Sequence, residues 1–229
     1  MHSLLGRAAA LLFPDAEGHH GVLPPLLVAL TFVTGLVDAV SYLGLDRVFV
    51  ANMTGNVVFL GFALAGDVQL SATASLLAAG SFVAGAWLGG RIAPRVARPL
   101  RLFALIVGAH AVLVAAALVL DVAADVRDVL IVLLALGMGL QNAVVGKLAV
   151  PDLNTTVLTR TLTGLAADRF GPASVRRFVS VAAMFAGALA GGLLQLRHGT
   201  VAALAPALLL LVLVALTALL PGAAEPRTS

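Results

Sequence analysis

The sequence predicts an all-α polytopic membrane protein with six spanning helices and two short, broken helices, arranged as two inverted repeats. Three observations lead to this fold class. The 229 residues are 61% hydrophobic and 11% charged, with a mean hydropathy of +1.07, whereas about 25% of residues are charged in a soluble domain. Long apolar runs follow one another along the chain. Short motifs of its first half also recur in its second half.

The apolar runs determine the expected helices. They occupy residues 22–45, 48–65, 70–90, 100–120, 129–146, 153–167, 178–196 and 201–220. A membrane-spanning helix needs about 20 residues, and all but the second and sixth runs meet this length. The second run is interrupted by ANMTGN, and the sixth is short and rich in threonine. A break in a helix leaves backbone N–H and C=O groups without helical partners. Within the membrane such groups are tolerated only where protein or a water-filled cavity surrounds them. We therefore expect both segments to enter the membrane and return on the same side.

The two broken segments hold equivalent places in an internal repeat. GLVDAV (35–40) recurs as GLQNAV (139–144), NMTGN (52–56) lies opposite VLTRT (157–161), and AGAWLGG (84–90) recurs as AGALAGG (186–192). Membrane helices rich in Ala and Gly resemble one another in any case, which is the alternative explanation. It does not account for the common order and spacing, so we favour a repeat.

Charged residues set the expected topology, because cytoplasmic loops carry an excess of Lys and Arg. One basic loop holds Arg91, Arg95, Arg98 and Arg101, and another holds Arg169, Arg176 and Arg177. The connection between the fourth and fifth runs is acidic, with Asp121, Asp125 and Asp128. Both basic loops are cytoplasmic only if the two broken segments do not cross. The halves are then inverted repeats, a design found in many transporters.

This topology divides the chain into four parts. Residues 1–21 form a cytoplasmic tail, 22–121 the first membrane repeat, 126–220 the second, and 221–229 a C-terminal tail. We expect a multi-pass protein of the bacterial inner membrane, with both termini cytoplasmic and the first helix serving as an uncleaved anchor.

The composition also excludes several classes of function. The absence of cysteine excludes disulfides, thiolate metal sites and cysteine nucleophiles. No basic face with interleaved aromatic residues is present, so we expect no nucleic-acid partner. No phosphate-binding loop occurs, and we expect no cofactor and no bound metal. His110 with Asp38 is the only pair that could support catalysis, so we expect no enzyme.

Candidate functional residues lie on the first helix and on the two broken segments. Asp38 is the one carboxylate well inside a membrane run, and it shares a helix face with Tyr42. An unpaired charge is expensive there, so Asp38 is either a proton or cation site or one partner of a structural salt bridge. The candidate solute-binding residues are Asp38, Tyr42, Asn52, Thr54, Asn56, Gln141, Asn142, Thr155, Thr159 and Arg160.

Arg160 is the expected partner of Asp38, because it is the one basic residue inside a broken run. The alternative is that its side chain reaches the cytoplasmic interface. Gln141 and Asn142 are the repeat-mates of residues 37 and 38, and a hydrogen bond between helices would also explain them. His110 is interpreted as a packed, hydrogen-bonded side chain.

The hydroxyl and amide groups favour a neutral or zwitterionic solute. We expect residues 52–56 and 155–163 to approach each other and to line a site at the repeat interface. The function is then a small-solute transporter or channel in the lipid bilayer; a non-transporting partner subunit or a membrane-embedded enzyme is the alternative. The GxxxG motifs at 85–89 and 187–191 pack helices inside the bundle or between protomers, so a homodimer stays open.

Two blocks of sequence resemble a known family. TGLVDAVSYLGLDRVFVANMTGNVV and GLQNAVVGKLAVPDLNTTVLTRTLTGLAAD are similar to the YoaK-like family, the bacterial domain of unknown function 1275, from about residue 25 to 220. The resemblance implies a polytopic membrane protein of this size and carries no substrate or site residue. A weaker similarity links GLAADRFG (164–171) to the cytoplasmic loop motif of major facilitator transporters, although the following basic pair comes later here.

Overall fold

The protein is a bundle of helices, known here from a computed structural model that describes residues 21–123, 126–153, 155–156 and 158–220. Its helices are α2 (Leu23–Gly44), α3 (Met53–Leu64), α4 (Ala72–Ile92), α5 (Pro99–Ala123), α6 (Arg127–Leu148), α7 (Leu158–Ala167) and α8 (Pro172–Leu219), with a 3-10 turn, η1 (Ala93–Arg95). No strand occurs in these ranges, which confirms the all-α prediction. Apart from Gly21, the two predicted tails lie outside the described residues.

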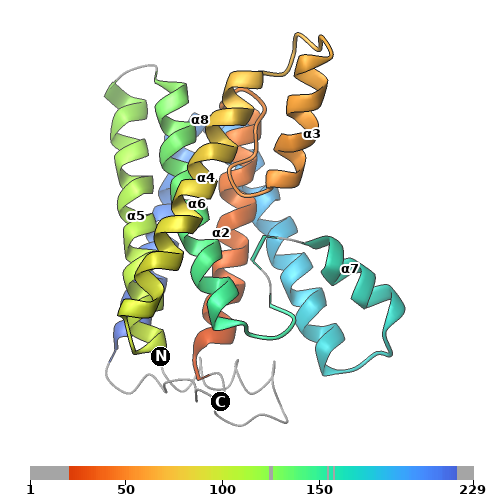
Figure 1. Ribbon diagram of the computed structural model, residues 1–229, viewed down its shortest axis with the longest axis vertical. Coiled ribbons are helices and arrows are strands. Elements are labelled where there is room, and N and C mark those ends of the chain that lie inside the picture. Colours follow the sequence, from red (N-terminus) through yellow and green to blue (C-terminus); the bar gives the residue numbers. More distant parts are fainter. Residues whose placement is uncertain (1–20, 124–125, 154, 157, 221–229) are drawn as a thin grey trace.

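Five helices of the described chain, α2, α4, α5, α6 and α8, are long and apolar enough to cross a membrane. The fifth, α8, has 48 residues and contains non-helical backbone at Gly199, with φ 82° and ψ −176°. That conformation is open essentially to glycine alone. At 1.5 Å per residue an unbroken helix of this length would measure about 72 Å, against about 30 Å of hydrocarbon. Figure 1 shows that the chain reverses direction within α8.

The two broken segments form helices of about half the spanning length. α3 has 12 residues and α7 has 10. In Figure 1 the chain leaves the upper end of α2, descends to about mid-height, and returns upward as α3. It leaves the lower end of α6 in the same way, rises to mid-height, and returns downward as α7. The starts of both short helices therefore lie near the middle of the bundle.

Short-range signals explain where several helices begin and end. Pro24 and Pro25 occupy the first turn of α2. The backbone N–H that proline lacks would have no helical partner there in any case. The Ser71 side chain caps α4 by accepting the N–H of Ala74. α6 ends at Ala149, which has a left-handed φ of 46°. These signals place the turns, but the packing of the helices depends on tertiary contacts.

Helices α2 and α8 pack against each other, as do α4 and α6, and both contacts use glycines. Gly35 of α2 faces the backbone of residues 184–188 of α8, and Gly139 of α6 faces that of residues 82–86 of α4. A Cβ at either glycine would lie under 3.0 Å from main-chain atoms. The backbones therefore approach more closely than any other residue would allow.

The two GxxxG motifs lie in the same contacts. Gly85 and Gly89 of α4 face α6, whereas Gly187 and Gly191 of α8 face α2. All four are buried within the chain. A homodimer through these glycine faces is therefore not supported, because the faces are already covered inside one chain.

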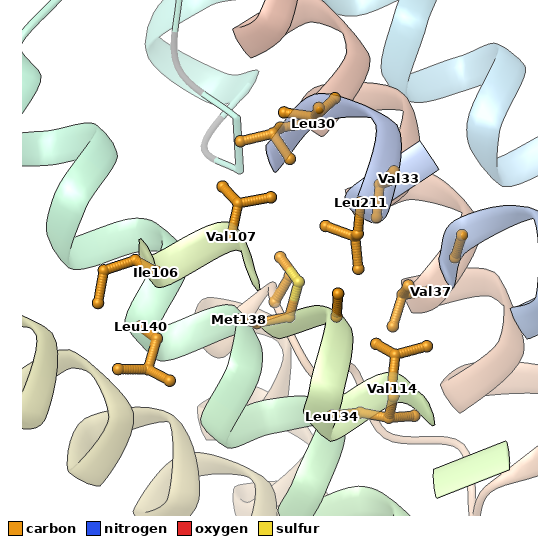
Figure 2. Packing of buried hydrophobic residues seen from close by; sticks show 14 of the residues in the cluster. Leu30, Val33, Val37, Ile106, Val107, Val114, Leu134, Met138, Leu140 and Leu211 are labelled. Atoms are coloured by element: carbon orange, nitrogen blue, oxygen red, sulfur yellow. The ribbon is translucent and has the colours of Figure 1, made fainter. Parts of the chain in front are cut away.

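The core lies where α2, α5, α6 and the second part of α8 meet. Figure 2 shows side chains from these helices converging on it, among them Val37, Val107, Met138 and Leu211. All four are 1% exposed or less. Because α3 and α7 lie outside this core, they contribute few buried side chains, and their sides are available to line cavities.

Candidate functional site

Asp38 holds the chain that descends from α2. Its Oδ1 accepts hydrogen bonds from the backbone N–H groups of Val50, at 3.0 Å, and Ala51, at 2.8 Å. Only eight residues connect α2 to α3, so this segment must fold back beside the helix it has just left. The carboxylate thus binds main-chain donors immediately before the first turn of α3, where negative charge is favoured.

The predicted ion pair between Asp38 and Arg160 is absent from the described part of the chain. Asp38 is half-buried beside α3, whereas Arg160 is exposed and lines a different cavity. The prediction was wrong because backbone N–H groups, which carry no sequence signal, satisfy the carboxylate instead.

Asn56 secures the same segment from the first turns of α3. Its side-chain amide accepts the N–H of Phe49 at 2.9 Å and donates to the carbonyl of Phe49 at 2.5 Å. Phe49 in turn stacks on Tyr42 and on Phe59, with ring centroids 5.1 and 5.6 Å away. Asn56 is fully buried, so its role here is to shape the segment.

The second half of the chain makes a related contact with neutral groups. Asn142, the predicted repeat-mate of Asp38, accepts a hydrogen bond of 2.6 Å from the Thr156 hydroxyl through its Oδ1. Thr156 precedes α7 as Ala51 precedes α3. The Thr155 hydroxyl is buried without a hydrogen-bond partner among the described residues. An amide therefore replaces the carboxylate at the second broken segment.

A cavity of about 540 Å³ lies between the two short helices. Its lining comes from α2, α3, α7, α8 and the connecting segments: Gly35, Asp38, Phe49, Asn52, Thr54, Gly55, Val58, Phe59, Thr156, Leu158, Thr159, Leu162, Met184 and Ala188. We call it the central cavity. The approach expected between residues 52–56 and 155–163 is present, but much of the lining is apolar, which the hydroxyl pattern did not predict.

Two further cavities lie near the ends of the bundle, and we name them outer and inner after the topology expected from the sequence. The outer cavity, about 650 Å³, is lined by Tyr42, Asp46, Arg47 and Arg127 among others. The inner cavity, about 630 Å³, is lined by Asn142, Thr156, Arg160, Arg177 and neighbouring residues. Thr156 lines both the inner and the central cavity, and Tyr42 of the outer cavity stacks on Phe49 of the central one.

The predicted site residues are thus divided among different places. Asp38, Asn52, Thr54 and Thr159 line the central cavity; Asn142 and Arg160 line the inner cavity; Tyr42 lines the outer one; Asn56, Gln141 and Thr155 are buried and line none of the three. The structure brings one carboxylate and several hydroxyl or amide groups together, and it separates them from the arginines.

Gln141 belongs to a buried network in the bundle core. Its Oε1 lies 3.1 Å from Nδ1 of His110, and its Nε2 donates to the Thr34 hydroxyl at 3.3 Å. All three side chains are 1% exposed or less. The contacts fit the inter-helix hydrogen bond considered for Gln141 and the packed, hydrogen-bonded role expected of His110; that the two residues bind each other was not predicted.

Sequence reasoning missed the aromatic and aliphatic part of the site. Phe49 and Phe59 flank the polar break on either side, and this flanking position was the available signal. Asp152 was missed as well: it binds Arg176 and Arg177, each at 2.8 Å. It joins the segment before α7 to the first turns of α8.

Comparison with known proteins places the sequence in a family. A family model described as "Protein of unknown function (DUF1275)" matches residues 26–217. The chain belongs to this family. It is also 35% identical over 150 residues to the UPF0700 transmembrane protein YoaK of Bacillus subtilis (strain 168), which covers 64% of this chain and 67% of that protein. No solved structure matches. The weaker similarity to major facilitator transporters has no support among these matches.

Proposed function

We propose that this membrane protein is a small-solute transporter or channel with its site at the interface of two inverted repeats. The arrangement of three cavities carries the proposal. Tyr42 and Phe49, whose rings stack, lie between the outer and central cavities, and Thr156 lies between the central and inner cavities. Together they outline a route along the two short helices, closed at two places by side chains that can rotate.

The route requires six spans, and the geometry of α8 supports that number. The reversal at Gly199 divides α8 into parts of 27 and 20 residues, each long enough to cross a bilayer alone. With α2, α4, α5 and α6 they supply six crossings, while α3 and α7 enter and return.

Matched contacts support the inverted repeat. Gly35 against residues 184–188 and Gly139 against residues 82–86 are equivalent contacts, at offsets close to those of the sequence motifs. Asp38 and Asn142 likewise hold the segments that lead into α3 and α7. Because the second set is turned over with respect to the first, the segments that lead into the two short helices come from opposite ends of the bundle, and both helices start near its middle (Figure 1).

Charge supports the orientation in a bacterial inner membrane. Arginines gather in and beside the α4–α5 and α7–α8 connections. Both connections lie at the end of the bundle where α2 begins and α8 stops (Figure 1). An excess of positive charge identifies the cytoplasmic side. We therefore propose that the first and last helices lead into cytoplasmic termini.

No catalytic step is part of this proposal. His110 bonds to Gln141 inside the core, and Asp38 bonds to the backbone beside α3, so the one pair considered for an enzyme does not share a site. A non-transporting partner subunit or a membrane-embedded enzyme is the alternative, and both differ from a transporter in one measurable property, since neither moves a solute across the membrane.

Solute flux into proteoliposomes tests the proposal, with a panel of neutral, zwitterionic and cationic organic solutes. Thr159→Trp would place an indole in the central cavity, whereas Thr163→Trp changes an exposed residue one turn later that does not line it. We expect flux through the wild type and the second variant, and loss of flux through the first. No flux of any solute, or equal flux through both variants, would overturn the proposal.

A further inference from the structure

The charged residues are unevenly distributed among the three cavities. The outer cavity is lined by two arginines and Asp46, and the inner cavity by two arginines and Asp152, so each has more cationic than anionic side chains. The central cavity is lined by Asp38 and by no described cationic side chain. Because the one charged residue in the lining of the central cavity is a carboxylate, this cavity suits a cation.

The remaining lining of the central cavity has a definite chemical character. Phe49 and Phe59 approach it from the connecting segment and from α3, with ring centroids 5.6 Å apart. Leu158, Leu162 and Met184 line it from the α7 and α8 side. An aromatic ring attracts an ammonium group that lies near it, and the aliphatic side chains can bury an apolar substituent.

The size and the donor set of the cavity argue against a bare metal ion. Calcium takes six to eight oxygen ligands at short distances, and magnesium needs a near-ideal octahedron. Here one carboxylate and a few hydroxyl or amide groups are spread over about 540 Å³. This volume lies within the range of about 300–1,000 Å³ that is typical of pockets for small organic molecules.

We propose that the central cavity binds a monovalent organic ammonium ion carrying an apolar substituent, with its charged group between Asp38 and the rings of Phe49 and Phe59. This rests on the proposed function and replaces the neutral or zwitterionic solute expected from the sequence with a cation. A zwitterion would bring a carboxylate into a cavity whose one charged lining residue is already anionic.

Equilibrium binding to the purified full chain in detergent micelles tests the inference by isothermal titration calorimetry. The probes are 2-phenylethylammonium, the neutral 2-phenylethanol and the anionic 3-phenylpropanoate, which share a phenyl group and a similar length. We expect the ammonium ion to bind at least about 10-fold more tightly than the other two, because hydrogen bonds to an ionised group are the stronger ones. Equal binding of the alcohol would overturn the inference.

Two variants locate the site. In Asp38→Asn the side-chain oxygen can still accept the N–H groups of Val50 and Ala51, so the fold is retained while the charge is removed. We expect ammonium binding to weaken by at least about 10-fold. The matched control is Asp67→Asn, an exposed carboxylate that accepts the N–H of Gln69 and lines none of the three cavities; its binding should equal wild type. Unchanged binding by Asp38→Asn would refute the site.

Phe59→Leu decides the case if Asp38→Asn does not fold. The variant keeps an apolar lining and removes the ring, so ammonium binding should weaken by about 2- to 30-fold and alcohol binding by less; equal losses would overturn the inference. Sodium at equal ionic strength should not compete with the ammonium ion for the central cavity.

Because binding is measured without a membrane, ammonium binding without flux would remove only the transport proposal. Flux of other solutes without ammonium binding would remove only this inference.

Discussion

Replacing Gly35 with alanine tests the close contact between α2 and α8. An added Cβ would lie 2.8 Å from the backbone nitrogen of Ala188 and closer still to the carbonyl of Met184. Both atoms belong to main chain inside a long helix, so they cannot move aside as a side-chain tip would. The two helices must separate, and overpacking of this kind costs about 1–3 kcal/mol. We expect a value near 3 kcal/mol, because the obstacle is backbone.

Gly80→Ala is the matched control. Gly80 also lies in a helix, α4, but nothing is within 4 Å of a Cβ added there. Both variants gain the same helix propensity, about 1 kcal/mol. The difference between their unfolding free energies therefore measures the cost of the close contact alone. Unfolding can be followed by labelling a cysteine placed at Ser180, which is fully buried, in a chain that otherwise has no cysteine.

The proposed repeat adds a second test to the same experiment. Gly139→Ala should cost as much as Gly35→Ala, because its Cβ would lie 2.9 Å from the nitrogen of Ala86 in the equivalent contact. The two glycines lie in separate helix contacts, so their effects should add within about 0.5 kcal/mol. If Gly35→Ala were as stable as Gly80→Ala, the reasoning about close approach would be refuted.

Three further predictions concern topology and charge. A cysteine at Asp67 should react with a membrane-impermeant reagent from outside and one at Arg169 only from inside; the reverse at either position contradicts the six-span topology. In thermal unfolding, the stability lost by the double variant of Asp38→Asn and Arg160→Gln should equal the sum of the two single losses within about 0.5 kcal/mol, because these residues line different cavities. A strong departure from that sum would support the ion pair instead. Asp152→Asn should lower the unfolding free energy by about 2 kcal/mol, since this carboxylate, 17% exposed, binds two guanidinium groups. The control Asp67→Asn should change it by less than about 0.5 kcal/mol. Equal losses in the two variants would contradict a stabilising role for the ion pairs of Asp152.

Features that depend on local composition were predictable from the sequence. Membrane character and the all-α class follow from apolar runs, because a helix in a bilayer must satisfy its own backbone hydrogen bonds. The shortness of α3 and α7 followed from the polar and threonine-rich interruptions. Asp38 was identified because an ionisable side chain is rare and costly at that depth.

The partners of these residues were not predictable in the same way. Asp38 is bound by the N–H groups of Val50 and Ala51, and every residue except proline carries such a group, so no side-chain pattern marks it. Arg160 seemed the natural partner because a sequence displays side chains only. The aromatic lining by Phe49 and Phe59 was hidden for a related reason, since an aromatic residue in a membrane run is ordinarily interpreted as lipid-facing or core.

The sequence by itself therefore determined the class of the protein, the places where its chain breaks, and the one carboxylate that had to be accommodated. These depend on the cost of burying polar groups, which acts on each residue where it stands. Only the tertiary structure decided that phenylalanine and aliphatic side chains line the cavity between the two broken segments, that the arginines lie in other cavities, and that the glycine motifs pack within one chain. Those outcomes depend on which backbones approach each other, a property of pairs of helices that no single stretch of sequence contains.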